Sequence, residues 1–171
     1  MSSGEQRKIL NIGLIGCGEV AQVVHIPTFL FMRSYFRITY LCDVSAAALR
    51  HAAGKIPNSS QITRDPAELC ASDAVDAVVV ANSDEYHAAH AILALQHNKH
   101  VLVEKPVALN KRDALAIEDA ERHSKGKVMV GYMRRYAAPF EDVIREIGGL
   151  DKILYARVRG MNIQDICERE T

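Results

Sequence analysis

Apolar runs alternate with amphipathic segments along most of the chain, as expected where buried strands are joined by surface helices. Val78-Val79-Val80 is apolar without alternation, which is typical of a strand covered on both faces. The predicted strands are Ile9–Ile15, Arg37–Cys42, Gln61–Thr63, Val75–Ala81, His100–Glu104 and Lys127–Tyr132. The predicted helices are Glu19–Val24, Ser45–Lys55, Pro66–Ala71, Glu85–His97, Lys111–Ser124 and Phe140–Ile147. This order predicts an α/β fold built on a doubly wound parallel sheet.

The turn after the first predicted strand carries a glycine-rich motif, Gly16-Cys17-Gly18-Glu19-Val20-Ala21. Gly16 permits a tight turn, Gly18 lets a pyrophosphate approach the backbone, and Ala21 lets helix and strand pack closely. The N-terminus of the following helix offers free N–H groups to phosphates. The motif therefore predicts a Rossmann-type NAD(P)-binding domain.

Asp43 ends the second predicted strand, 22 residues after Ala21. An acid at this spacing accepts hydrogen bonds from the adenosine ribose hydroxyls. The alternative is that Asp43 caps the next helix. Ser45 is the better cap, because a helix-forming run begins directly after it, and Asp43 is then left for the ribose.

Length and charge limit the choice of partners. The chain has 171 residues, with 21 basic and 21 acidic side chains, so charge gives no argument for nucleic acid or an anionic membrane. No apolar run approaches the length of a membrane span. The four cysteines, Cys17, Cys42, Cys70 and Cys167, follow no metal-binding spacing, and a cytoplasmic location is the simplest expectation.

Three regions are expected along the chain. Residues 1–8 are polar and predict a loose tail, and residues 9–148 form the dinucleotide-binding domain. Gly148 and Gly149 mark a boundary, so residues 149–171 begin an incomplete C-terminal α+β domain. The strand-like run Ile153–Arg159 is its first strand or, alternatively, an extra edge strand of the first sheet.

A second motif, Glu104-Lys105-Pro106, follows the predicted strand His100–Glu104. Ligands of open parallel sheets bind beyond the carboxyl ends of the strands. A desolvated lysine there can exchange a proton with a substrate hydroxyl, which makes Lys105 the candidate catalytic residue. Pro106 stiffens the turn and is a candidate for a cis bond. The alternative is an ordinary solvated lysine.

Together these motifs resemble the Gfo/Idh/MocA family, named for glucose–fructose oxidoreductase, inositol 2-dehydrogenase and the rhizopine catabolism protein. The resemblance covers roughly Lys8 to Gly160. It also rests on Ala81-Asn82-Ser83-Asp84-Glu85-Tyr86-His87 and Gly131-Tyr132-Met133-Arg134-Arg135-Tyr136. It implies that Lys105 lies at the reaction centre. It also implies cofactor contacts from the glycine-rich loop (Gly16, Gly18, Glu19, Val20, Ala21), Asp43, Asn82, Ser83, His87, Glu104, Lys105, Pro106 and Arg135.

The chain departs from the family pattern in three ways. Ser83 stands where the family often has proline, and Met133 stands where a polar residue is frequent. The family's catalytic Asp and His belong to a second domain that is absent from this sequence, and Asp165 matches no family motif. We therefore expect this chain alone to be catalytically incomplete.

The resemblance implies hydride transfer between NAD(P) and a secondary alcohol of a sugar, cyclitol or diol. NAD is favoured over NADP, because Asp43 would repel a 2′-phosphate. A homo-oligomer formed through the second domain would fit the resemblance. The alternatives are a non-catalytic, ligand-sensing regulator of the same fold, or a protein that binds a partner along its terminal strand.

Two histidine pairs, His87/His90 and His97/His100, have a spacing that resembles metal-ligand pairs. Nothing with a fitting spacing completes either set, so no metal site is predicted. His87 is interpreted as the residue that opens a helix near the cofactor.

Overall fold

A computed structural model describes residues 8–57 and 60–155. The chain divides into two compact units, Met1–Gly131 and Tyr132–Thr171. The predicted tail lies outside the described residues apart from Lys8.

The first unit is built on a six-stranded parallel sheet with the order β3-β2-β1-β4-β5-β6. Its strands are β1 (Leu10–Ile15), β2 (Phe36–Cys42), β3 (Gln61–Thr63), β4 (Ala77–Val80), β5 (His100–Val103) and β6 (Val128–Val130). The intervening α-helices are α1 (Ile26–Phe31), α2 (Ala46–Ala53), α3 (Pro66–Ala71), α4 (His87–Gln96) and α5 (Lys111–Arg122). The predicted doubly wound sheet is confirmed, with strand ends that differ by up to two residues from the predicted ones.

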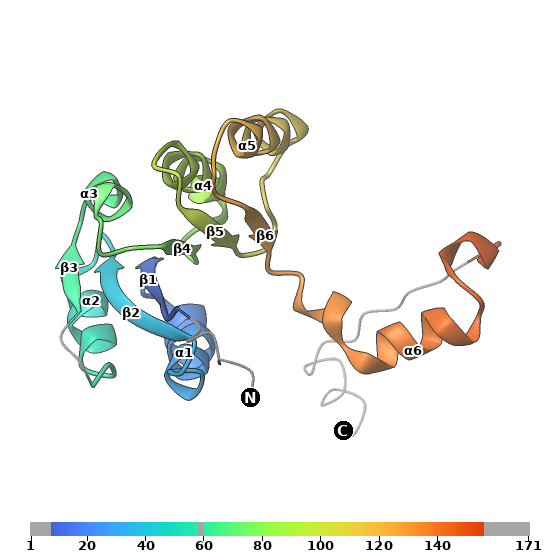
Figure 1. Cartoon of the computed structure of the whole chain (residues 1–171), viewed down its shortest axis with the longest axis horizontal. Coiled ribbons are helices and arrows are strands. Elements are labelled where there is room, and N and C mark those ends of the chain that lie inside the picture. The colour runs from blue at the N-terminus through green and yellow to red at the C-terminus, as the bar shows by residue number, and fades with distance from the viewer. Residues whose placement is uncertain (1–7, 58–59, 156–171) are drawn as a thin grey trace, which may run out of the picture. The chain divides into compact units, whose positions relative to one another are not determined.

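Helices cover both faces of the sheet, and each face has its own apolar core (Figure 1). Helices α3, α4 and α5 lie over one face, and α1 and α2 lie over the other. Successive residues of β4 alternate between the cores, since Val78 and Val80 join the first and Val79 joins the second. The unbroken valine run is therefore explained by burial on both faces.

The carboxyl ends of the strands are held in register by hydrogen bonds that continue past the strands themselves. The Gly16 amide donates to the Cys42 carbonyl at 2.8 Å, and the Ala81 amide donates to Ile15 at 2.8 Å. The Glu104 amide donates to Val80 at 2.9 Å, and the Gly131 amide donates to Val103 at 2.8 Å. The loops that carry the predicted site residues therefore start from one hydrogen-bonded edge of the sheet.

The helix after the glycine-rich turn differs from the prediction. It begins at Glu19, as predicted, but continues through a π-helical segment, η1 (Ala21–His25), and through α1 to Phe31 rather than ending at Val24. Pro27 lies in the first turn of α1, and a proline ring crowds the carbonyl four residues before it. The wider π turn, in which the Ile26 amide donates to the Ala21 carbonyl, lets the helix pass this proline.

The second unit contains a 3-10 turn η3 (Met133–Tyr136), α6 (Ala138–Glu146) and a 3-10 turn η4 (Leu150–Lys152). The predicted helix Phe140–Ile147 is present as α6. Ile153 to Tyr155 follow η4 and are not in a strand. The rest of the predicted strand Ile153–Arg159 lies outside the described residues, and the boundary at residue 148 stays a prediction.

Candidate dinucleotide-binding site

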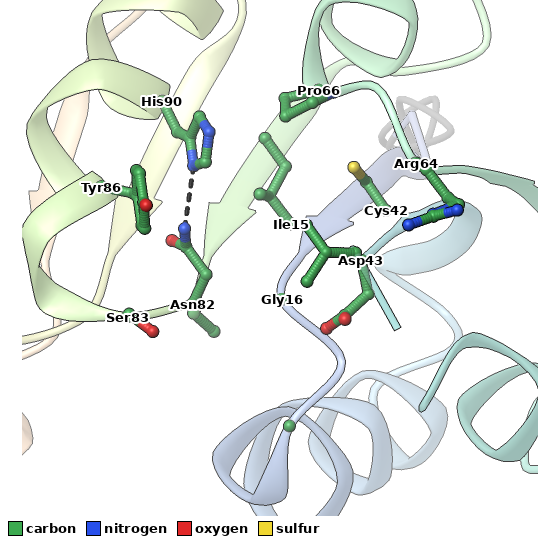
Figure 2. Close-up of a pocket in the computed structure, with 13 residues that line it drawn as sticks. Ile15, Gly16, Cys42, Asp43, Arg64, Pro66, Asn82, Ser83, Tyr86 and His90 are labelled. Atoms are coloured by element: carbon green, nitrogen blue, oxygen red, sulfur yellow. Dashed lines mark hydrogen bonds between the residues drawn. The ribbon is translucent and has the colours of Figure 1, made fainter. Parts of the chain in front are cut away.

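A cavity of about 610 Å³ lies at the carboxyl ends of β1, β2 and β4 (Figure 2). Its walls come from the loops that follow these strands, from the loop after β3, and from the first turn of α4. The lining residues are Ile15, Gly16, Gly18, Cys42, Asp43, Val44, Arg64, Pro66, Ala81, Asn82, Ser83, Tyr86 and His90. Five predicted cofactor-binding residues are thus brought together, namely Gly16, Gly18, Asp43, Asn82 and Ser83.

The two positions of the turn that hold glycine, 16 and 18, differ in why a small residue suits them. Gly16 has φ +95°, and a Cβ there would lie 2.5 Å from the Ala81 carbonyl carbon and from the Asn82 amide nitrogen. Only glycine tolerates this position without distortion. A Cβ on Gly18 would meet no atom within 4 Å, so this side of the turn is an open cradle. That open space suits the close approach of a pyrophosphate.

Asp43 is oriented by backbone donors on both sides of its carboxylate. Its Oδ2 accepts from the Cys17 amide at 2.7 Å, and its Oδ1 accepts from the Ser45 amide at 2.7 Å. Ser45 is the cap of α2, because its hydroxyl accepts from the Ala48 amide at 3.3 Å. The predicted cap at Ser45 is therefore confirmed, and the ribose contact of Asp43 stays a prediction. Each carboxylate oxygen keeps a further lone pair for a ligand hydroxyl.

Two buried thiols lie beside this carboxylate and stay neutral. Burial, followed by the charge of Asp43, raises the pKa of Cys17 to about 12. The same two causes raise the pKa of Cys42 to about 12. Neither thiol therefore adds negative charge next to the turn that would receive phosphate groups.

The opposite wall is formed by Asn82, Tyr86 and His90 (Figure 2). The side-chain nitrogen Nδ2 of Asn82 donates to Nδ1 of His90 at 3.0 Å. The His90 ring stacks on the Tyr86 ring, with 5.9 Å between the ring centroids. The Asn82 Oδ1 atom is buried and has no partner among the described residues. A buried polar atom without a partner is costly, and a ligand N–H or O–H would supply one. The open turn, the oriented carboxylate and this oxygen fit an adenosine-containing dinucleotide.

His87 lies behind the cavity wall and does not line it. Its side chain is buried, with Nδ1 2.7 Å from the Pro106 carbonyl oxygen and Nε2 3.0 Å from the Asn82 carbonyl oxygen. The ring thus joins the loop after β4 to the loop after β5. Both loops carry residues that the family resemblance assigns to the cofactor.

Glu104, Lys105 and Pro106 follow β5 at the same edge of the sheet, and none of them lines the cavity. The Lys105–Pro106 bond is cis, as the sequence suggested. The Lys105 side chain is exposed in the first unit, so its expected desolvation stays a prediction. Glu104 is partly buried and pairs with His25, a partner that was not predicted from the sequence.

Three further predicted residues belong to the helix start. Glu19 and Val20 are exposed, whereas Ala21 is fully buried in the core under β1, as its small size suggested. Arg135 lies on η3 in the second unit and stays a prediction.

The predicted cofactor-binding residues leave out eight of the residues that line the cavity, among them Val44, Arg64, Tyr86 and His90. Val44 and Arg64 follow strands at the carboxyl edge of the sheet, so their position was an available signal. Tyr86 and His90 are four residues apart at the start of a helix, so both can face one wall.

The Asn82–His90 contact predicts a pH-dependent stability. Burial, followed by the charge of His87, lowers the pKa of His90 in the folded chain. A histidine with a lowered folded-state pKa stabilises the fold above its unfolded value of about 6.5, and this contribution is lost as the pH falls through the folded-state value. The protonated ring also cannot accept the Asn82 amide hydrogen.

Thermal unfolding should show this effect. We expect the unmodified chain to lose more stability between about pH 7.5 and about pH 5.5 than the His90→Asn variant does. His51→Asn, at an exposed position of α2, is the matched control and should behave like the unmodified chain. Equal losses in all three proteins would contradict the assigned role of His90.

No grouping of three or more His, Cys, Asp or Glu side chains that could hold a metal ion occurs within residues 8–57 and 60–155. In the same part of the chain, none of the helices is both long and apolar enough to cross a membrane.

The fold and the cavity together define a dinucleotide-binding domain of the Rossmann class. Residues 10–132 match the family described as "Oxidoreductase family, NAD-binding Rossmann fold" (GFO_IDH_MocA). The chain belongs to this family.

Curated proteins that are similar in sequence to this chain are named dehydrogenases. The chain is 34% identical over 137 residues to inositol 2-dehydrogenase 2 of Saccharopolyspora erythraea, which covers 80% of this chain and 40% of that relative. It is 29% identical over 163 residues to a 1-carboxy-3-chloro-3,4-dihydroxycyclohexa-1,5-diene dehydrogenase of Comamonas testosteroni, covering 94% of this chain and 40% of that relative. The chain therefore spans about 40% of the length of these relatives.

Solved structures share the fold. Myo-inositol dehydrogenase from Lactobacillus casei, in complex with NAD(H) and myo-inositol, aligns with TM-score 0.76 and 25% identity, covering 82% of this chain and 41% of that chain. A 3-ketoreductase from Actinomadura kijaniata, in complex with NADP, aligns with TM-score 0.74 and 22% identity, covering 82% of this chain and 42% of that chain. Relatives of this fold thus hold either dinucleotide.

Proposed function

We propose that this chain is the cofactor-binding domain of a dehydrogenase that moves hydride between NAD and a secondary alcohol of a sugar, cyclitol or diol. One observation carries the proposal. A single cavity combines an open glycine turn, a carboxylate oriented by backbone amides, and a buried amide oxygen without a partner among the described residues. The names of the relatives support a polyol substrate, with inositol dehydrogenases prominent among them.

The residues of this chain have separable roles in the proposal. The turn at Gly16 and Gly18 receives the pyrophosphate, Asp43 accepts the adenosine ribose hydroxyls, and Asn82 and Ser83 complete the wall on the β4 side. The nicotinamide group, when bound, supplies or takes the hydride. Lys105 exchanges a proton with the substrate hydroxyl at the end of β5.

The preference for NAD rests on Asp43. A 2′-phosphate would face this carboxylate, lose the ribose hydrogen bonds and meet like charge. Arg64 lines the same cavity and is the strongest argument for NADP, because a nearby arginine can receive a 2′-phosphate. We propose that Asp43 influences the choice of cofactor more than Arg64 does, because two backbone amides fix the orientation of the Asp43 carboxylate.

Replacing Asp43 with serine should therefore weaken NAD binding and narrow its advantage over NADP. Loss of charge-assisted hydrogen bonds predicts a decrease in NAD affinity of about tenfold to a hundredfold. Calorimetric titration of both cofactors measures the change, and Asp73→Ser, at an exposed position before β4, is the control. Tighter binding of NADP than NAD by the unmodified chain would overturn the assignment.

A second experiment addresses the substrate. Dehydrogenase assays with a panel of inositols, sugars and diols should show no turnover by residues 1–171, because the family resemblance assigns the catalytic Asp and His to a second domain. Robust turnover would contradict the proposal that the catalytic site is incomplete in this chain.

We also propose a reducing, cytoplasmic compartment for this chain. The free buried thiols of Cys17, Cys42 and Cys70 are in keeping with that compartment.

A further inference from the structure

The carboxylate of Glu104 is held on one side by a buried histidine from a distant part of the sequence. His25 Nε2 lies 2.9 Å from Oε1 of Glu104, and the two residues are 79 positions apart. Their side chains are only 10% and 18% exposed. A pair this well buried is screened less by solvent than a surface ion pair.

His25 reaches Glu104 from the last position of the π-helical segment η1. Its ring stacks with that of Phe29, with 6.3 Å between centroids, so packing also fixes its orientation. Short π-helical segments are frequent at functional sites, because the extra residue turns one side chain away from the regular helical position. Here that side chain is the one that contacts Glu104.

Two more contacts surround the Glu104 carboxylate. The Lys105 amide donates to Oε2 of Glu104 at 3.2 Å. A Cβ on Gly131 would lie 3.3 Å from the carboxyl carbon and from both oxygens, so the carboxylate packs closely against this glycine. Glu104 is thus enclosed by η1, by its own loop and by the residue that follows β6.

The neighbouring ammonium has no partner within residues 8–57 and 60–155. Lys105 is exposed, and within the described part of the chain its Nζ has neither a hydrogen bond nor an ion pair. The carboxylate of the preceding residue is the negative group nearest in sequence, and it faces His25 instead. The arrangement keeps opposite charges on adjacent residues apart.

We propose that His25 is a positioning residue that holds the Glu104 carboxylate away from the Lys105 ammonium, so that Lys105 stays available to the substrate hydroxyl. The inference rests on the proposed function of Lys105 in proton transfer. Without the histidine, Glu104 is free to turn toward Lys105. An ion pair between them would stabilise the protonated amine and occupy the group that must exchange a proton.

The rate at which the Lys105 amine reacts with an acylating reagent measures how far an ion pair holds it protonated, because only the neutral amine attacks the reagent. The folded chain is treated briefly with acetic anhydride, and acetylation at each lysine is measured by peptide mass spectrometry. Exposed Lys111, at the start of α5, is the internal reference. We expect His25→Leu to slow acetylation of Lys105 by about twofold to fivefold, the factor that an exposed ion pair supplies.

Two variants separate positioning from general disruption. Adding Glu104→Gln to His25→Leu should restore the rate, because the amide cannot form the ion pair. His25→Gln, which retains an N–H donor, should stay close to the unmodified rate. A Lys105 rate that is unchanged in folded His25→Leu, or is not restored by Glu104→Gln, would overturn the inference.

The proposal can be tested even if His25→Leu does not fold. In that case Glu104→Gln alone is compared with the unmodified chain. Similar rates of Lys105 acetylation in the two proteins support the inference that His25 already holds the Glu104 carboxylate. Faster acetylation in Glu104→Gln would show that Glu104 pairs with Lys105 in the native protein, and would overturn the inference. These measurements need no cofactor or substrate, so their outcome is distinct from that of the dinucleotide titrations.

Discussion

Replacing Gly16 with valine should remove dinucleotide binding and destabilise the domain by about 3 to 5 kcal/mol, near the upper end for a single substitution. The backbone at Gly16 has φ +95°, which a β-branched residue does not tolerate. Its Cβ would also lie 2.5 Å from backbone atoms of Ala81 and Asn82, which a rotamer change cannot relieve. Urea unfolding measures the stability, and titration with NADH measures the binding.

Gly18→Ala is the matched control for this substitution. A Cβ at Gly18 meets no atom within 4 Å, so the free energy of unfolding should change by less than about 1 kcal/mol. The new methyl group would stand where the pyrophosphate approaches, and affinity for NADH should fall by at least about tenfold. If Gly18→Ala binds NADH as well as the unmodified chain, the pyrophosphate does not pass this turn.

Replacing Lys105 with methionine should reduce turnover by about a hundredfold to ten-thousandfold, the usual range for loss of a general acid or base. The experiment uses a form of the protein long enough to include a substrate domain and to turn over a polyol. Because Lys105 does not line the cavity at the ends of β1, β2 and β4, the dissociation constant for NADH should change far less than kcat. The measurement is steady-state kinetics beside a cofactor titration.

Lys111→Met, at an exposed position of α5, is the control and should keep the original rate. An equal rate in Lys105→Met would show that Lys105 is an ordinary solvated lysine. A parallel loss of cofactor affinity and turnover would instead assign Lys105 to cofactor binding.

Much of the fold was predictable because its signals are local. Each strand is a short apolar run followed by turn residues, and Ser45 precedes its helix in the position of a cap. The glycine-rich turn and Asp43 follow adjacent strands of a parallel sheet, so their meeting at one edge follows from topology. These features needed no knowledge of side-chain packing.

The parts that were not predicted depend on contacts between distant residues. The pairing of His25 with Glu104 requires the π-helical turn and the packing of η1 beside the end of β5. His87 was assigned to the cofactor from the family resemblance, which stays a prediction, and the position of its two ring nitrogens beside two loop carbonyl oxygens was not foreseen. The helix continuing past Pro27 was also missed, because the π turn that accommodates this proline has no simple sequence pattern.

We expect the chain to bind a nicotinamide dinucleotide in the cavity at the ends of β1, β2 and β4. Titration of the 15N-labelled chain with NADH, followed by amide NMR, locates the binding site residue by residue. Saturable chemical-shift changes are expected at Gly16, Gly18, Asp43 and Asn82. Arg33 and Arg37, which line a separate groove of about 330 Å³ beside α1 and β2, should stay unchanged. Shifts confined to that groove, or no shifts in a folded sample, would show that NADH does not bind in the cavity at the ends of β1, β2 and β4.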